Sequence, residues 1–118
     1  TDFPGDIDGL AVRAARIIRD RACEGLTVGE VVASLPTTRR TLERRFKGAF
    51  NRSLHEEMTR IRMAEAARLL TSTRLRPIEI TERVGYTDTK HFITVFRRHM
   101  GVPPVAYRKG HTSDAADK

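Results

Sequence analysis

The sequence contains a single cysteine, Cys23, among its 118 residues, so a framework of intramolecular disulfides is excluded. No apolar run approaches the roughly 18 residues that a membrane-spanning helix needs. The four histidines and one cysteine form no zinc-binding pattern, and we find no Ser/His/Asp set, glycine-rich phosphate loop or supported acidic pair. We therefore expect no enzyme activity, no metal, no cofactor and no membrane contact, and a cytoplasmic protein.

Acidic residues are outnumbered: 15 Asp and Glu stand against 22 Lys and Arg, which gives a net charge of +7. Eighteen of the 22 basic residues are Arg, the cation suited to forked hydrogen bonds with phosphate and guanine. This balance points first to nucleic acid and second to an anionic membrane surface. The length allows one domain or two very small ones.

No stretch shows the sustained period-two alternation of a strand, so the sequence predicts an all-α fold of about seven helices. Capping residues and glycine or proline stops delimit them. We expect helices at about 8–24, 28–35, 38–50, 53–71, 77–84, 89–100 and 103–107. Residues 1–7 are expected to be an N-terminal tail, and 110–118 a disordered tail.

An internal repeat divides the chain. Residues 26–36 match 75–85 at an offset of 49, and residues 42–51 match 92–101 at an offset of 50. Each copy is a short helix, a tight turn and a capped longer helix, which is a helix-turn-helix pattern. Chance matches within a helical bundle are the alternative. The sequence thus predicts helix-turn-helix subdomains at 8–52 and 73–109, joined by a linker helix at 53–72.

The longer helix of each copy has the properties of a DNA-reading helix. In the first, four polar residues share one face at helical spacing, opposite an apolar face. The polar face is Arg40, Glu43, Arg44 and Lys47, and the apolar face is Leu42, Phe46 and Phe50. Residues 38–52 carry a net charge of +5 and residues 86–109 carry +4, whereas residues 1–25 carry −1. A linker helix of 19 residues is roughly 28 Å long, comparable with the ~34 Å between successive major grooves on one face of DNA.

These features resemble the DNA-binding domain of AraC/XylS-type transcription regulators over about residues 10–108. The most specific motifs are ITERVGY at 80–86, HF and FRR within 91–98, and GVPPVAYR at 101–108. Residues 22–47 look most similar to the xylose-operon-regulator branch. That resemblance implies a missing N-terminal effector-binding domain, a sugar-binding domain like the periplasmic binding proteins, which agrees with a chain that begins at Thr1.

The resemblance also implies roles for individual residues. The expected base contacts are Arg40, Glu43 and Arg44 in the first unit, and Thr89, Lys90, His91 and Thr94 in the second. The expected backbone contacts are Thr38, Arg39, Lys47, Arg97 and Arg98. The sequence departs from the family pattern at Arg45, Asn51, Glu57 and Thr94. Thr94 stands where an Arg often reads a base, so the second helix is expected to contact mostly backbone.

Several of these residues have competing interpretations. Glu43 can accept from a cytosine amino group or pair with Arg39 or Lys47. Thr38 and Asp88 are expected above all as N-caps. Arg45 lies near the apolar face, where a buried or snorkelling structural role is favoured over DNA contact.

The predicted function is sequence-specific binding of double-stranded DNA by a transcription regulator, an activator of a sugar-utilisation operon, through two recognition helices in successive major grooves. A non-specific basic nucleic-acid-binding protein is the first alternative. A helical protein–protein module, such as an adaptor to RNA polymerase, is the second. RNA polymerase is also a candidate partner of an activator.

Overall fold

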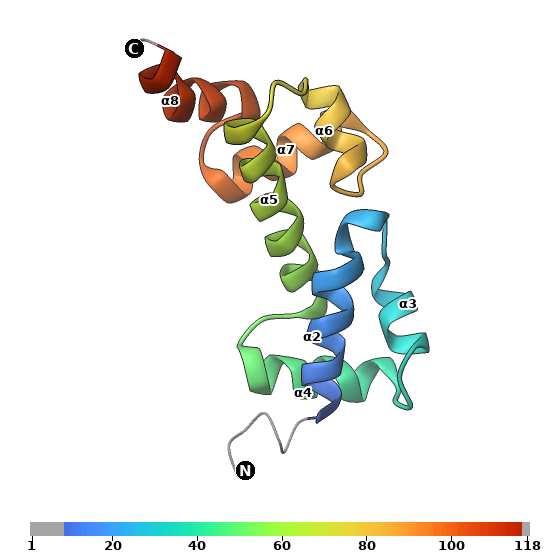
Figure 1. The fold of residues 1–118 in the computed structure, drawn as a ribbon. Helices are drawn as coiled ribbons and strands as arrows, with labels where there is room; N and C mark the ends of the chain where they lie inside the picture. The colour runs from blue at the N-terminus through green and yellow to red at the C-terminus, as the bar shows by residue number, and fades with distance from the viewer. Residues whose placement is uncertain (1–8, 117–118) are drawn as a thin grey trace. The chain divides into compact units, whose positions relative to one another are not determined.

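A computed structural model describes residues 9–116, with side chains as far as His111; residues 1–8 and 117–118, including the predicted N-terminal tail, lie outside it. The described residues form helices and no strand, which confirms the all-α prediction (Figure 1). In order they are α2 (Gly9–Arg21), the 3₁₀ turn η1 (Ala22–Glu24), α3 (Val28–Ala33), α4 (Arg39–Phe50), α5 (Leu54–Ser72), α6 (Pro77–Arg83), α7 (Thr89–Met100) and α8 (Pro104–Ala116).

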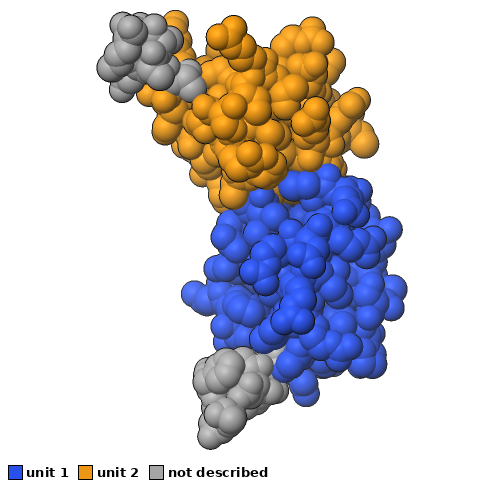
Figure 2. All heavy atoms as spheres, in the orientation of Figure 1, with its two compact units in different colours: residues 1–61 blue, residues 62–118 orange. Residues whose placement is uncertain are grey.

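The chain divides into two compact units, residues 1–61 (unit 1) and 62–118 (unit 2) (Figure 2). The division falls inside α5, the longest helix at 19 residues. Buried side chains continue along it on both sides of the division, with Leu54 and Met58 in unit 1 and Met63 and Leu70 in unit 2. None of the described helices is long and apolar enough to cross a membrane.

The short first helix of each repeat begins with the same device. In α3 the Glu30 carboxylate accepts a hydrogen bond from the Thr27 backbone amide at 2.9 Å. In α6 the matching Glu79 accepts from the Arg76 amide at 2.7 Å. Each bond satisfies a backbone donor that a helix start leaves free. The repeated Glu therefore performs one structural task in both copies.

The longer helices of the repeat, α4 and α7, also begin and end in the same way. The Thr38 hydroxyl accepts from the Thr41 amide at 3.2 Å at the start of α4, and the Asp88 carboxylate accepts from the Lys90 amide at 3.0 Å at the start of α7. At the opposite ends, Asn51 has φ 61° and Gly101 has φ 90°, both left-handed. This conformation closes a helix and suits Gly and Asn. The predicted caps and ends of these two helices are confirmed, whereas the cap expected for the first helix, Asp6 or Asp8, lies outside the described residues.

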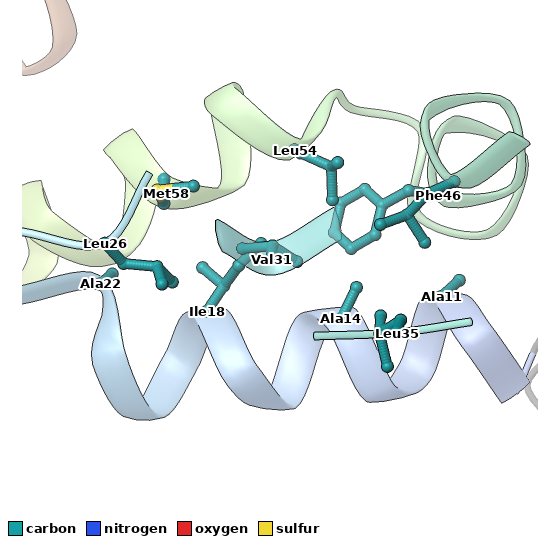
Figure 3. Packing of buried hydrophobic residues seen from close by; sticks show 11 residues of the cluster. Ala11, Ala14, Ile18, Ala22, Leu26, Val31, Leu35, Phe46, Leu54 and Met58 are labelled. Carbon is teal, nitrogen blue, oxygen red and sulfur yellow. The ribbon is translucent and has the colours of Figure 1, made fainter. Parts of the chain in front are cut away.

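The core of unit 1 forms where α2 packs against α3 and α4 (Figure 3). Its α2 face is mostly alanine, so the neighbouring helices can approach closely. Of the predicted apolar face of α4, Leu42 and Phe46 are fully buried and Phe50 is half-buried. The buried cluster is Ala11, Ala14, Ile18, Ala22, Leu26, Val31, Leu35, Leu42, Phe46, Leu54 and Met58.

One apolar residue of unit 2 lies outside the core: 55% of Ile78 in α6 is exposed. It precedes the buried Ile80 by two residues, which turns it about 200° around the helix axis. Thr81 is buried instead, at 1% exposure, and its hydroxyl donates to the Pro77 carbonyl at 2.8 Å.

The last helix is longer than the sequence suggested. A short helix ending near Tyr107 and a disordered tail from Gly110 were expected; the helix is longer than that, because α8 continues to Ala116. Tyr107 packs edge-on against Phe96 (centroids 5.4 Å apart), and His111 stacks on Tyr107 (4.0 Å). These ring contacts stabilise the turn that follows Tyr107, which the small polar residues there do not predict.

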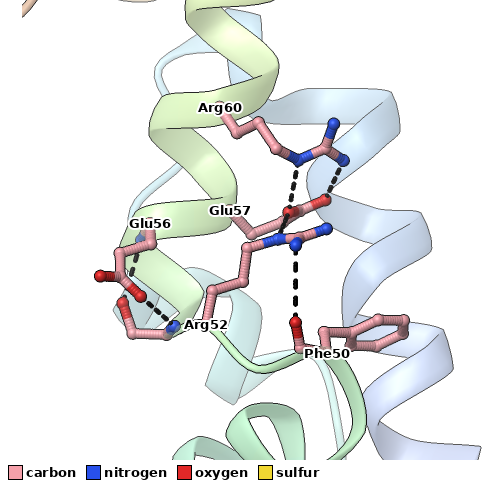
Figure 4. Close-up of polar contacts among 6 residues, drawn as sticks. Phe50, Arg52, Glu56, Glu57 and Arg60 are labelled. Atoms are coloured by element: carbon pink, nitrogen blue, oxygen red, sulfur yellow. Dashed lines mark hydrogen bonds and ion pairs between the residues drawn. The ribbon is translucent and has the colours of Figure 1, made fainter. Parts of the chain in front are cut away.

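A buried carboxylate holds two arginines at the start of α5 (Figure 4). Glu57 is 5% exposed. Arg60 donates to it through Nε at 2.9 Å and Nη2 at 2.7 Å, and Arg52 donates through Nε. Burial of the carboxyl opposes ionisation, but the hydrogen bonds from Arg60 and Arg52 outweigh that cost, so the pKa of Glu57 is lowered.

We predict that this carboxylate makes unit 1 sensitive to acid. Because the pKa of Glu57 is lower in the folded state, its contribution to stability is present above the unfolded pKa, about 4.3, and is lost as the pH falls through the lower folded value. Glu57→Gln should therefore flatten the acid side of the stability profile, measured by urea unfolding and circular dichroism. Glu24→Gln, which alters an exposed pair with Arg21, is the control and should leave the profile unchanged.

Candidate nucleic-acid interface

The outward face of α4 is a row of cations. Arg40, Arg44 and Lys47 are exposed on the side of the helix opposite the buried Leu42 and Phe46. This separation follows from the sequence, because positions three, four and seven apart share a helix face. Burial of the phenylalanine side thus fixes which side the cations present.

The two arginines of this face have no partner among the described residues. Within the described residues, neither Arg40 nor Arg44 forms an ion pair or a side-chain hydrogen bond. Lys47 lies close enough to Glu56 to help lower the pKa of that carboxyl, after the larger effect of its hydrogen bond with the Ser53 backbone. The guanidinium donors of Arg40 and Arg44 are therefore available to phosphate or guanine.

Glu43 is the one predicted base-reading residue of α4 that already has partners among the described residues. Its Oε1 accepts from the Leu54 amide at 3.3 Å, and its Oε2 lies 3.9 Å from Nε of Arg39. One carboxylate thus joins the exposed start of α4 to the first turn of α5. Of the two interpretations of Glu43, the structure contains the pair with Arg39, and base contact stays a prediction.

Three neighbouring residues complete this end of unit 1. Thr38 is exposed as the cap of α4, and Arg39 is exposed beside Glu43. Arg45 is exposed too, at the edge of the apolar face, so it is not buried there; a snorkelling structural role stays a prediction. Arg52, counted in the local charge of +5, is half-buried against Glu57 and does not belong to the outward row.

The matching helix of unit 2 presents a similar row. Lys90, Thr94 and Arg97 lie at i, i+4 and i+7, opposite the buried Phe92 and Phe96, and all three are exposed. Thr94 donates its hydroxyl to the Lys90 carbonyl at 3.1 Å. A shallow depression of about 370 Å³ runs along this row, lined by Ile93, Thr94, Arg97, Arg98 and Gly101.

The other two predicted base-reading residues of α7 lie off this row. His91 is exposed on the flank of the helix, with its ring edge-on to Tyr86 at 5.6 Å. The Arg62 guanidinium lies 5.3 Å from the centroid of the same tyrosine ring. Thr89 is half-buried in the first turn. The structure therefore groups Lys90, Thr94 and Arg97 in one row, and His91 and Arg98, seven positions apart, lie along its edge.

Sequence reasoning missed residues that support these helices. It assigned no role to Tyr86, which packs on both His91 and Phe92. It also missed Arg108, whose guanidinium donates to the carbonyls of Leu70 and Thr73 at 2.9 and 3.0 Å and so closes the end of α5. Neither partnership has a local sequence signal, since Arg108 bonds to residues 38 and 35 positions away.

The outward face of each unit has the geometry of a binding surface. In the part of the chain that the structure describes, no three His, Cys, Asp or Glu side chains are grouped to hold a metal ion. What each unit offers is a convex helix with exposed cations and a fixed apolar back. That arrangement suits the edge of a nucleic-acid groove.

Comparison with known proteins agrees with this interpretation. A family model described as a helix-turn-helix domain matches residues 31–110. The xylose operon regulatory protein of Haemophilus influenzae is 35% identical over 108 residues, covering 92% of this chain and 28% of its own. This chain thus spans little more than a quarter of that relative.

Two solved structures add the fold. A structure titled as the xylose-binding transcription activator xylR has 30% identity and a TM-score of 0.75, over 87% of this chain and 27% of its own. The DNA-binding domain of AdpA, in complex with a target DNA, has 25% identity and a TM-score of 0.81, over 92% and 97%. The chain belongs to the AraC-type helix-turn-helix family, the DNA-binding domains of transcription regulators.

Proposed function

We propose that this domain reads double-stranded DNA specifically, with α4 and α7 entering two major-groove segments of one site. The observation that carries the proposal is the pair of matched outward rows, Arg40, Arg44 and Lys47 on α4 and Lys90, Thr94 and Arg97 on α7. Both rows are exposed, and the back of both helices is buried. A helix held in this way can insert as a rigid body.

The helices α4 and α7 would contribute unequally to base recognition. Arg40 and Arg44 can each make a bidentate contact with guanine, whereas the centre of the α7 row is Thr94, which can make only single hydrogen bonds. We therefore assign base reading mainly to α4, together with Lys90 and His91 on α7. Thr38, Arg39, Lys47, Arg97 and Arg98 would contact phosphates and set the register. The site should be asymmetric, because the two rows differ.

The experiment is a fluorescence-anisotropy titration at several salt concentrations, comparing duplexes from upstream of the gene with a scrambled duplex. We expect the specific duplex to bind at least about 10³-fold more tightly than the scrambled duplex near 0.15 M salt. In the bound duplex, inserting about five base pairs between the half-sites should turn one half-site to the far side of the helix. This insertion should abolish the gain from the second half-site.

Two results would contradict the proposal. Equal affinities that fall together with salt would favour a non-specific basic protein. Tolerance of the insertion would mean that only one helix reads the site. An absence of any DNA affinity would leave the protein–protein module as the better account.

We further propose that the domain serves a longer, sugar-responsive activator in the cytoplasm, with an N-terminal effector-binding domain and RNA polymerase as a second partner. The support is the pair of similar proteins named for xylose regulation, one of them titled an activator. With the full-length protein, transcription from a promoter carrying the mapped site should rise when xylose is added. A fall in transcription, or indifference to xylose, would refute that assignment.

A further inference from the structure

Unit 1 has a second basic surface away from the outward row of α4. A pocket of about 320 Å³ lies between α2, the end of α4 and the start of α5. Four arginines from these elements line it, and we call it the arginine groove: Arg16, Arg19, Arg52 and Arg60. None of these residues has a role in the proposed DNA contacts.

The groove carries an excess of positive charge. The buried Glu57 is its one acidic lining residue, and it is already bonded to Arg52 and Arg60. Arg16 and Arg19 are exposed, and neither forms an ion pair within the described residues. The four arginines and one carboxylate therefore leave a net charge of +3.

Two of the arginines are held in place before any partner arrives. Arg60 is fixed to Glu57 by two hydrogen bonds, and Arg52 is fixed between Glu57 and the Phe50 carbonyl at 3.4 Å (Figure 4). Their side chains are nevertheless 47% and 36% exposed. Side chains ordered in this way lose less conformational entropy on binding an anion than free ones do.

The remaining walls of the groove are apolar. Val12 and Ala15 line it from α2, Phe50 from α4 and Ile61 from α5. Phosphates are fully polar and gain nothing from such walls. Phe50 is half-buried at the last residue of α4, ten residues from Arg40, or about 15 Å along the helix. The groove therefore fits a protein segment better than a DNA backbone.

We propose that the arginine groove binds an acidic, amphipathic segment of a partner protein. Its Asp and Glu carboxylates would pair with Arg16 and Arg19 and take the remaining donors of Arg52 and Arg60. An apolar side chain of the segment would pack against Phe50 and Ile61. This surface is separate from the DNA-reading rows, so one domain can hold both partners.

The test uses a short fluorescein-labelled peptide in which Asp and Glu alternate with Leu and Phe. A second peptide has Ser in place of Leu and Phe. Anisotropy titrations compare the unchanged protein with Arg16→Glu and with Arg13→Glu. Arg13 is the matched control, because it is exposed one turn earlier on α2, carries the same charge and does not line the groove.

We expect Arg16→Glu to lower the affinity for the amphipathic peptide about tenfold or more. Arg13→Glu should change that affinity little. Arg40→Ala should leave peptide binding intact, and Arg16→Glu should leave affinity for duplex DNA intact. Circular dichroism checks that each variant keeps its helices.

Three results would overturn the proposal. Equal losses from Arg16→Glu and Arg13→Glu would reduce the effect to overall charge. Equal binding of the Ser peptide would remove the role of the apolar walls. A loss of DNA affinity in Arg16→Glu, without loss of the peptide, would make the groove a phosphate contact.

Discussion

Phe46→Ala is expected to lower the free energy of unfolding of unit 1 by about 3–5 kcal/mol. Phe46 is fully buried between α4 and the rest of the cluster. The centroid of its ring lies 4.8 Å from that of Phe50. At about 0.05–0.15 kcal/mol per residue, a unit of this size has little more stability than that to lose. The α4 row would lose its support, and specific DNA affinity would fall with it.

Urea unfolding and DNA titration of the same samples test this expectation. Phe50→Ala is the matched control: the same ring is removed from the same helix, but from a half-buried position, so the loss of stability should be smaller. A Phe46→Ala protein that kept both its stability and its specificity would contradict the claim that this core positions the reading helix.

Arg40→Ala is the variant expected to change base recognition most clearly. A bidentate contact between arginine and guanine contributes roughly 1–3 kcal/mol of discrimination. Arg40 is exposed and has no ion pair within the described residues, so its removal leaves no partner unsatisfied and should not affect folding. Preference should disappear at one or two adjacent positions of one half-site, as measured by titrating a set of single-base variants of the site.

Arg45→Ala is the control for charge. Arg45 lies on the same helix and is exposed, but it is outside the row formed by Arg40, Arg44 and Lys47. Its loss should weaken all duplexes equally or not at all. If Arg40→Ala instead weakens every sequence by the same factor, Arg40 contacts phosphate, and base reading in unit 1 would fall to Arg44.

The sequence alone located the helices because the interactions that begin and end a helix are local. Glu30 and Glu79 each bond three residues back, and Asn51 and Gly101 close their helices through their own backbone angles. The repeat, the buried faces and the row of Arg40, Arg44 and Lys47 follow from positions three or four apart. Family membership was visible in the same local motifs.

Tertiary structure decided which charged side chains already have partners within the protein. The sequence could not reveal that Glu43 accepts from an amide of α5 or that Arg108 closes the end of that helix. It also could not reveal that Arg52, one of the cations in the local charge of +5, lies against Glu57. A side chain's partners depend on which distant elements surround it, and helical periodicity carries no record of those elements.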